Sequence, residues 1–256
     1  ASPISAVITV IPAAGGCTGP SYTYNITVYP AFVPGAAFSN QSVCAQTIPA
    51  MLTATIPSGG SAPYTYQWEQ STDNLTYIPI AGATNMNYQP PVLPVSTWYR
   101  QAQTSSGSCG TVYTNAIKIT VNALPVPTIS GASNACVNTS GNVYTTEAGM
   151  SAYAWTVTGG TIDGPVNTSS ISVTWNSAGN QQITVNYNNA SGCSAQSPAS
   201  KIVTVQSTVI PSITGPDPSC TGFTVTYSTE PGMSAYVWTV SSGGSIVGAS
   251  NTNSIS

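Results

Sequence analysis

The sequence predicts an all-β protein in which several β-sandwich domains follow one another like beads on a string. Three observations support this fold class: the chain repeats itself internally, short segments alternate between apolar and polar residues, and no window has the periodicity of an amphipathic helix. The 256 residues are enough for two to three small domains. We therefore expect a tandem array rather than a single domain.

The internal repeat is most visible in two pairs of near-identical segments. EAGMSAYAWTV at 147–157 recurs as EPGMSAYVWTV at 230–240, and NTSSIS at 167–172 recurs as NTNSIS at 251–256. The offset between partners is nearly the same in both pairs. Agreement between segments this far apart predicts that one structural unit occurs more than once.

The cysteines repeat with a similar spacing and form two interleaved series. The members are Cys17, Cys109 and Cys193 in one series, and Cys44, Cys136 and Cys220 in the other. The interval from the first member to the second is identical in the two series, and so is the slightly shorter interval from the second member to the third. A unit of about 84 to 92 residues therefore repeats along the chain.

Proline-containing junctions at the ends of apolar strands, such as KITVNALPVPTISG, place the unit boundaries. They divide the chain into the C-terminal part of one repeat (1–29), two complete sandwiches (30–124 and 125–207) and the N-terminal part of a further repeat (208–256). Half a sandwich exposes a sheet edge and an unfilled core. We therefore expect both end segments to be completed, either by flanking sequence or by the matching segment of another copy. The residue count favours flanking sequence.

Within the 125–207 unit, the residues alternate with a period of two. Three successive strands each place their apolar residues on one face: Tyr153, Trp155 and Val157; Ile171, Val173 and Trp175; Ile183, Val185 and Tyr187. Glycine-containing turns separate these strands. About seven short strands in such a unit predict a β-sandwich of immunoglobulin-like type.

Each unit carries a tryptophan, namely Trp68, Trp155 and Trp238. A tryptophan on a central strand of a sandwich usually fills the core, so we expect all three to be buried rather than to form a ligand platform. Trp98 and Tyr99 are neighbours on a predicted strand and must point to opposite faces, which leaves one of the two rings as a possible exposed contact for a sugar.

The cysteines lie at opposite ends of each unit's sequence, which predicts one disulfide within each unit. The expected pairs are Cys44 with Cys109 and Cys136 with Cys193, which leaves Cys17 and Cys220 with partners outside the chain. A metal or redox site is the alternative, but the sequence has no CxxC spacing and no histidine. We therefore expect structural disulfides, formed in an oxidising compartment, and no metal.

The charge content is very low, with 3 Lys+Arg and 6 Asp+Glu, or 4% of residues against about 25% in typical globular proteins. Because the chain has so few cations, we expect it to bind neither nucleic acid nor an anionic membrane surface. Scattered carboxylates without histidine predict no enzyme and no cofactor. No apolar run is long enough to cross a bilayer, so we expect no membrane insertion.

Longer segments carry a resemblance to a known class of repeats. The unit from CAQTIPAMLTATIPSGG to TNAIKITV resembles the immunoglobulin-like repeats of very large secreted proteins of the Bacteroidota. AYAWTVTGGTI, VTWNSAG and GCSAQSPASKIVTV resemble their PKD-like repeats, and ITVIPAAGGCTGPSYTYNITVYP resembles the end of another repeat class found beside them. Such arrays occur in gliding-motility surface adhesins of the SprB type, exported by the type IX secretion system, and in stalks of secreted hydrolases.

The resemblance implies a stalk or fibre of an extracellular, cell-surface adhesin, without catalytic residues. Its partners would be the neighbouring repeats of the same long chain, and its weakly charged surface would allow fibres to pack side by side. Two alternatives stay open. One is a glycan-binding module that recognises surface glycans with an exposed aromatic strip, and the other is an accessory stalk of a secreted hydrolase.

Overall fold

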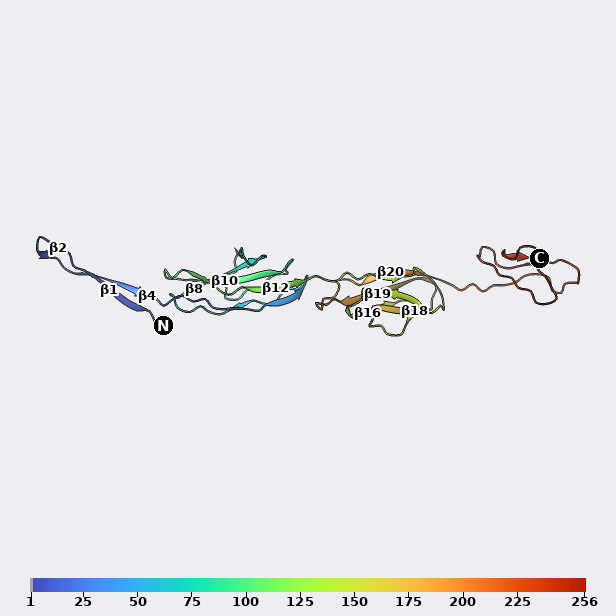
Figure 1. Ribbon diagram of the computed structural model, residues 1–256, viewed down its shortest axis with the longest axis horizontal. Helices are drawn as coiled ribbons and strands as arrows, with labels where there is room; N and C mark the ends of the chain where they lie inside the picture. The colour runs from blue at the N-terminus through green and yellow to red at the C-terminus, as the bar shows by residue number, and fades with distance from the viewer. Residues whose placement is uncertain (1) are drawn as a thin grey trace.

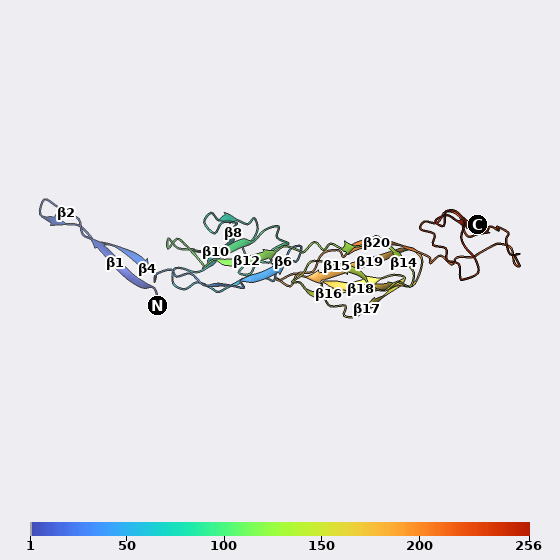
Figure 2. The ribbon, with the colours of Figure 1, turned by 45° about the vertical axis from the view of Figure 1, so that its right-hand side comes forward.

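The computed structural model describes residues 2–256, and every regular element among them is a β-strand. Figures 1 and 2 show these strands laid out along one long axis in chain order, from an N-terminal hairpin through two sandwiches to a C-terminal segment. The all-β class and the tandem β-sandwich architecture predicted from the sequence are confirmed. Among residues 2–256, no helix is long and apolar enough to cross a membrane.

The N-terminal segment is a two-stranded antiparallel ribbon. Its strands are β1 (Ile4–Val10) and β4 (Tyr22–Val28), with β2 (Ala13–Ala14) and β3 (Cys17–Thr18) at the tip. Ile8 lies opposite Tyr24, so one face of the ribbon is apolar, whereas Ser5 lies opposite Thr27 on the polar face. Every residue of β1 and β4 is exposed to solvent.

The first sandwich is built on one large sheet with the order β6-β12-β10-β8-β9, with β11 paired to β10, and on a small second sheet of β5 and β7. The strands are β5 (Ala37–Phe38), β6 (Gln41–Cys44), β7 (Thr53–Ala54), β8 (Tyr64–Ser71), β9 (Ile78–Pro79), β10 (Thr97–Ser105), β11 (Thr111–Tyr113) and β12 (Ile117–Asn122). Alternate residues point inward, and Leu52, Trp68, Tyr99 and Ile119 are fully buried between the sheets.

The second sandwich has two four-stranded sheets, with the orders β13-β15-β18-β17 and β14-β20-β19-β16. The strands are β13 (Ser130–Gly131), β14 (Asn134–Cys136), β15 (Asn142–Thr145), β16 (Ser151–Val157), β17 (Gly160–Asp163), β18 (Ser170–Trp175), β19 (Gly179–Asn188) and β20 (Ala199–Gln206). Tyr144, Val173, Trp175 and Val185 are fully buried in its core.

Residues 207–256 contain only two short strands, β21 (Tyr227–Ser228) and β22 (Ser254–Ile255). Their local geometry nevertheless copies the preceding sandwich. The indole nitrogen of Trp238 donates a hydrogen bond to Thr252 O, as that of Trp155 does to Thr168 O, and both bonds measure 2.9 Å. The division of the chain into the four segments 1–29, 30–124, 125–207 and 208–256 stays a prediction.

The tryptophans of the repeats differ in burial. Trp68 is fully buried and Trp155 is 7% exposed. Trp238 is only partly buried, so the expectation that it is a core residue is wrong for this structure. Trp155 lies on β16, which pairs with β19, whereas Trp238 has no such neighbouring strand among the described residues.

Candidate functional site

A disulfide closes the junction between the two sandwiches. Cys44, at the end of β6, is bonded to Cys193, in the loop between β19 and β20, with an S–S distance of 1.98 Å and a Cα–Cα distance of 5.6 Å. The two residues are 149 positions apart in the sequence. The bond therefore joins two domains and not two strands of one domain.

The predicted pairs Cys44–Cys109 and Cys136–Cys193 are therefore wrong. We call the end of a sandwich that faces the following repeat its C-terminal pole, and the opposite end its N-terminal pole. Cys44 lies at the C-terminal pole, because β6 runs parallel to the last strand β12 and ends beside Asn122. Cys109 lies at the N-terminal pole, in the turn that connects β10 to β11. Residues at opposite ends of the unit's sequence are thus at opposite ends in space.

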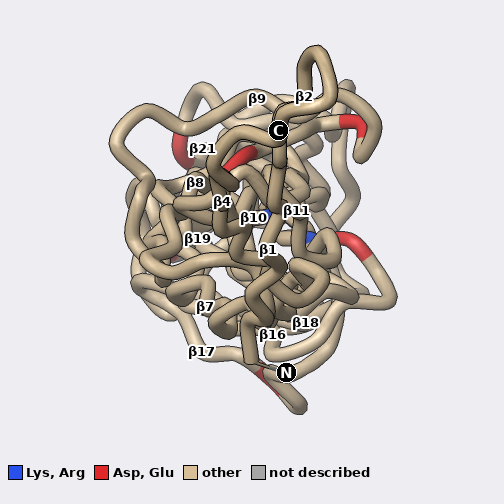
Figure 3. Tube along the Cα trace, turned by 90° about the vertical axis from the view of Figure 1, so that its left-hand side faces the viewer, with Lys and Arg blue, Asp and Glu red and all other residues tan. Residues whose placement is uncertain are grey.

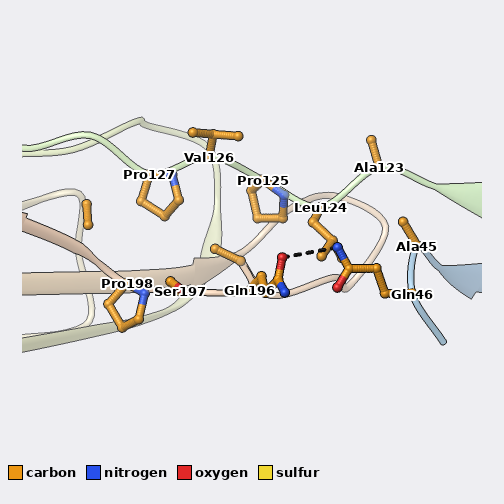
Figure 4. A pocket seen from close by; sticks show the side chains of 12 residues that line it. Ala45, Gln46, Ala123, Leu124, Pro125, Val126, Pro127, Gln196, Ser197 and Pro198 are labelled. Atoms are coloured by element: carbon orange, nitrogen blue, oxygen red, sulfur yellow. Dashed lines mark hydrogen bonds between the residues drawn. The ribbon is translucent and has the colours of Figure 1, made fainter.

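Two hydrogen bonds support the disulfide at this junction. The side-chain amide of Asn189 donates to Ala123 O in the linker at 2.9 Å, and the amide of Gln46 donates to Gln196 Oε1 at 3.1 Å (Figure 4). Asn189 Oδ1 also accepts the backbone N–H of Cys193 at 3.0 Å. One asparagine therefore shapes the turn that presents Cys193 and holds the linker of the preceding sandwich.

The linker lies in an open groove of about 540 Å³ between the sandwiches (Figure 4). The groove is lined by Ala45, Gln46, Ala123, Leu124, Pro125, Val126, Pro127 and residues 195–199. Proline fixes its own φ and restricts the residue before it, so Pro125 and Pro127 make this linker stiff. None of the lining residues is titratable, and the groove offers no acid–base chemistry.

The carboxylate of Glu147 anchors the chain where it leaves the linker. It accepts hydrogen bonds from the backbone N–H of Thr128 at 3.1 Å, from the Thr128 and Thr146 hydroxyls at 2.5 and 2.7 Å, and from the Tyr187 hydroxyl at 2.9 Å. Partial burial raises the pKa of Glu147, but the hydrogen bonds from Thr128 and Thr146 outweigh it and hold the pKa at about 2. Burial and the bond to Glu147 raise the pKa of Tyr187 to about 12.

Glu230 repeats this arrangement at the start of the next repeat. It accepts the backbone N–H and the hydroxyl of Ser212 and, at 2.5 Å, the hydroxyl of Thr229. Hydrogen bonds from Ser212 and then Thr229 lower the pKa of Glu230 to about 2. The sequence analysis treated the carboxylates as scattered. The shared pattern Thr-Glu-x-Gly-Met, at the offset of the repeat, was the signal that could have identified this pair.

The two neighbouring aromatic residues on β10, Trp98 and Tyr99, have different environments. Tyr99 points into the core and is fully buried, and its hydroxyl has no hydrogen-bond partner among the described residues. Burial raises the pKa of Tyr99. Trp98 points to the outer face and is partly exposed, with the Lys118 ammonium nitrogen 4.5 Å from its ring centre.

The other aromatic rings on this outer face are also covered by a cation. The Arg100 guanidinium lies 4.0 Å from the ring centres of both Tyr77 and Tyr113, and its Nε donates to Glu69 Oε2 at 2.8 Å. A sugar would have to displace these cations before it could stack on the rings. The geometry therefore does not favour the glycan-binding alternative.

Charges are sparse over the whole molecule. Figure 3 shows the few Lys, Arg, Asp and Glu positions as isolated coloured segments on an otherwise uncharged trace. Within residues 2–256, no group of three or more His, Cys, Asp and Glu side chains could hold a metal ion. The remaining cysteines are unpaired in this part of the chain: Cys109 is half-buried, and Cys17, Cys136 and Cys220 are exposed.

Comparison with known protein families now identifies the repeats. A model of the PKD-like domain matches residues 121–202 and again residues 206–256, together more than half of the chain. The chain belongs to the PKD-like domain family. Residues 33–123 of this PKD-like protein match a domain of unknown function, DUF8696. No curated protein sequence matches the chain.

Solved structures similar to the PKD-like chain include other tandem β domains. The fibronectin(III)-like modules of Clostridium thermocellum CbhA are 14% identical, with a TM-score of 0.30, over 66% of this chain and 90% of theirs. Immunoglobulin domains 1–4 of Sidekick-1 are 10% identical, with a TM-score of 0.33, over 81% and 68%. Cadherin domains 1–4 of protocadherin gamma B7 are 13% identical, with a TM-score of 0.33, over 80% of this chain and only 57% of theirs.

PKD-like domains are commonly extracellular adhesion or stalk modules, and they are typically non-catalytic. The Cys44–Cys193 disulfide agrees with an extracellular or surface location, because disulfides persist in oxidising compartments.

Proposed function

We propose that this PKD-like chain is a stiff stalk segment of an extracellular adhesive protein, in which each sandwich adds length and each junction limits bending. The observation that carries the proposal is the Cys44–Cys193 bond. Domains joined by a short linker normally move relative to one another. Here a second covalent connection accompanies the linker, and two domains fixed at two separate points cannot swivel freely about either of them.

The weaker contacts of the junction add to this restraint. The Asn189–Ala123 and Gln46–Gln196 hydrogen bonds each contribute about 0.5 to 1.5 kcal/mol, and Pro125 and Pro127 limit the conformations of the linker. The Glu147 carboxylate then fixes the first residue after the linker to the second sandwich. Both ends of the linker, at Ala123 and at Thr128, are thus held by hydrogen bonds.

The surface and the sequence favour one kind of parent protein. With 4% charged residues, neighbouring stalks would repel one another only weakly, so lateral packing into fibres would meet little electrostatic resistance. The resemblance of the repeats to Bacteroidota arrays favours a cell-surface adhesin of the SprB type, exported by type IX secretion and used in adhesion or gliding. A secreted hydrolase with the same stalk would differ only in its accompanying domains.

Residual dipolar couplings measured by NMR on the whole chain test the stiffness. If the junction is rigid, the core strands of both sandwiches fit one alignment tensor in the oxidised protein and two different tensors in the Cys44→Ser variant. Cys136→Ser is the matched control, because it removes an exposed thiol and leaves the junction bond intact. Two different tensors in the oxidised wild-type protein would refute the stalk proposal.

A further inference from the structure

Cys136 occupies the same place in the second sandwich as the bonded Cys44 does in the first. Cys44 lies in parallel register with Asn122 at the end of β12, and Cys136 lies in parallel register with Gln206 at the end of β20. In both cases the next backbone N–H donates to the carbonyl of that strand end, at 2.8 and 2.9 Å. Cys136 therefore lies at the C-terminal pole of its sandwich.

The backbone after these cysteines is also the same. Gln46 and Asn138, two residues after Cys44 and Cys136, have φ values of 67° and 61°. The third member, Cys220, is followed at the same distance by Gly222 with a φ of 83°. Because non-glycine residues rarely adopt a left-handed conformation, this agreement shows that the same turn follows Cys44 and Cys136, and the glycine after Cys220 has the same sign of φ. We call Cys44, Cys136 and Cys220 the pole cysteines.

The other series shares a different position. Cys193 lies in the hairpin between β19 and β20, Cys109 in the β10–β11 hairpin and Cys17 in the β2–β3 hairpin. A glycine with a φ of 77° to 82° adjoins each of them, as the tight turns require. We call Cys17, Cys109 and Cys193 the hairpin cysteines. Cys193 lies where its repeat meets the repeat before it, and Cys109 lies at the N-terminal pole of its own repeat.

The spacing between the two series is constant. Each hairpin cysteine is followed by a pole cysteine, and the segments 17–44, 109–136 and 193–220 are equal in length. Each connecting segment contains the last strand of one repeat and the linker, and the segments 17–44 and 109–136 also contain the first strands of the next repeat. The number of residues from a hairpin cysteine to the next pole cysteine is therefore constant, although the repeats themselves differ in length.

We propose that the Cys44–Cys193 bond is one rung of a ladder, in which the pole cysteine of each repeat is bonded to the hairpin cysteine of the next repeat. Cys136 is then a half-cystine whose partner is the cysteine of a β19–β20-type hairpin completing the 206–256 repeat. Cys109 is the half-cystine for the pole cysteine of the repeat that contains β1 and β4. The proposal concerns bonds alone and does not depend on the stalk function.

Each rung forms by thiol–disulfide exchange with a disulfide-bonded oxidoreductase as the oxidant. The Cys136 thiolate attacks the oxidant's disulfide, forms a mixed disulfide and releases one oxidant thiolate. The hairpin thiolate then attacks the Cys136 sulfur and displaces the second oxidant thiolate. The two protein thiols lose two protons and two electrons, and the oxidant leaves as a dithiol.

The ladder would create a short covalent path along the array. From Cys44 the path crosses to Cys193 and follows the connecting segment to Cys220, so it bypasses the 149 positions that separate the two bonded cysteines in sequence. Fully extended, the segment 193–220 spans at most about 97 Å. Tension on the array would therefore be carried by the connecting segments, whose strands are already extended. Most residues of each sandwich would lie outside this path and would bear no tension.

Disulfide mapping of the secreted protein, isolated from the cells that make it, tests the ladder. A non-reduced digest with chymotrypsin and trypsin separates Cys136, Cys193 and Cys220, because Tyr144 and Tyr187 lie between the first two and Lys201 lies between the last two. We expect Cys136 to be linked to the hairpin cysteine of the following repeat, in the same molecules that carry Cys44–Cys193. A free Cys136 thiol, or a bond from Cys136 to Cys109 or Cys220, would overturn the proposal.

A designed extension gives a controlled version of this test. Because Ser172 and Ser256 occupy equivalent positions, residues 173–206 are appended after Ser256, which supplies a copy of the β19–β20 hairpin. Oxidation should link Cys136 to the appended cysteine and remove two further thiols, one from each of these residues. Serine at the appended cysteine is the control and should leave Cys136 open to alkylation. If the appended repeat does not fold, the disulfide map of the secreted protein still tests whether Cys136 is bonded to a hairpin cysteine.

Discussion

Reduction of the Cys44–Cys193 bond should release a large and calculable length of chain when the protein is stretched. While the bond is intact, the residues between Cys44 and Cys193 lie in a covalent loop and cannot be extended by tension between the termini. The sequence separation of 149 residues corresponds to about 490 to 540 Å of extended chain. The bonded Cα atoms are only 5.6 Å apart, so almost all of that length is hidden.

Single-molecule pulling from the two termini measures this length directly. The oxidised protein should reach a contour length shorter by about 500 Å than the reduced protein, and the Cys44→Ser variant should behave like the reduced protein without added reductant. Cys136→Ser serves as the control and should keep the short contour. Both major cores lie mainly inside the loop, so most of the length that their unfolding releases should appear only after the bond is broken.

The same measurement distinguishes the observed bond from the pairing within units. Bonds Cys44–Cys109 and Cys136–Cys193 would close two smaller loops, and they would release about 215 to 235 Å and about 190 to 205 Å in two separate steps. Two such steps would refute the junction bond. Equal contour lengths in the oxidised and reduced protein would do so as well.

Three further predictions concern the sandwiches. Glu147→Gln should lower the free energy of unfolding by about 1 to 3 kcal/mol at pH 7, because a charged acceptor of Thr128 is lost. The folded pKa of Glu147 is depressed to about 2, so this contribution is present above the unfolded pKa near 4.5 and should disappear in urea titrations as the pH falls toward 2. Tyr99→Phe should leave thermal stability unchanged or raise it, by up to about 1 kcal/mol, because it removes a buried hydroxyl without a partner; a large loss would show that the hydroxyl is bonded. Glycan arrays should show no specific binding, and a reproducible signal abolished by Trp98→Ala would favour a binding module instead.

The fold was predictable from the sequence because its evidence is local. Alternation along Ile171, Val173 and Trp175 indicates a half-buried strand, and the structure buries all three. The recurrence of whole segments, such as NTSSIS and NTNSIS, indicates tandem units independently of any contact. The carboxylate arrangement of Glu147 was not predicted, since it depends on Thr128 and Tyr187, which are brought together only by the fold.

The disulfide was not predictable by the same means, because sequence order does not specify which pole of a sandwich a cysteine reaches. Had β6 run antiparallel to β12, Cys44 would have ended at the N-terminal pole, near the hairpin that holds Cys109. The parallel pairing of β6 and β12 places it instead at the C-terminal pole, beside Asn122. Because β14 and β20 repeat this parallel pairing, each repeat directs one cysteine forward and one backward along the array. The direction of one short strand therefore determines whether the disulfides form within single domains or between neighbouring domains. Only disulfides between domains stiffen a stalk.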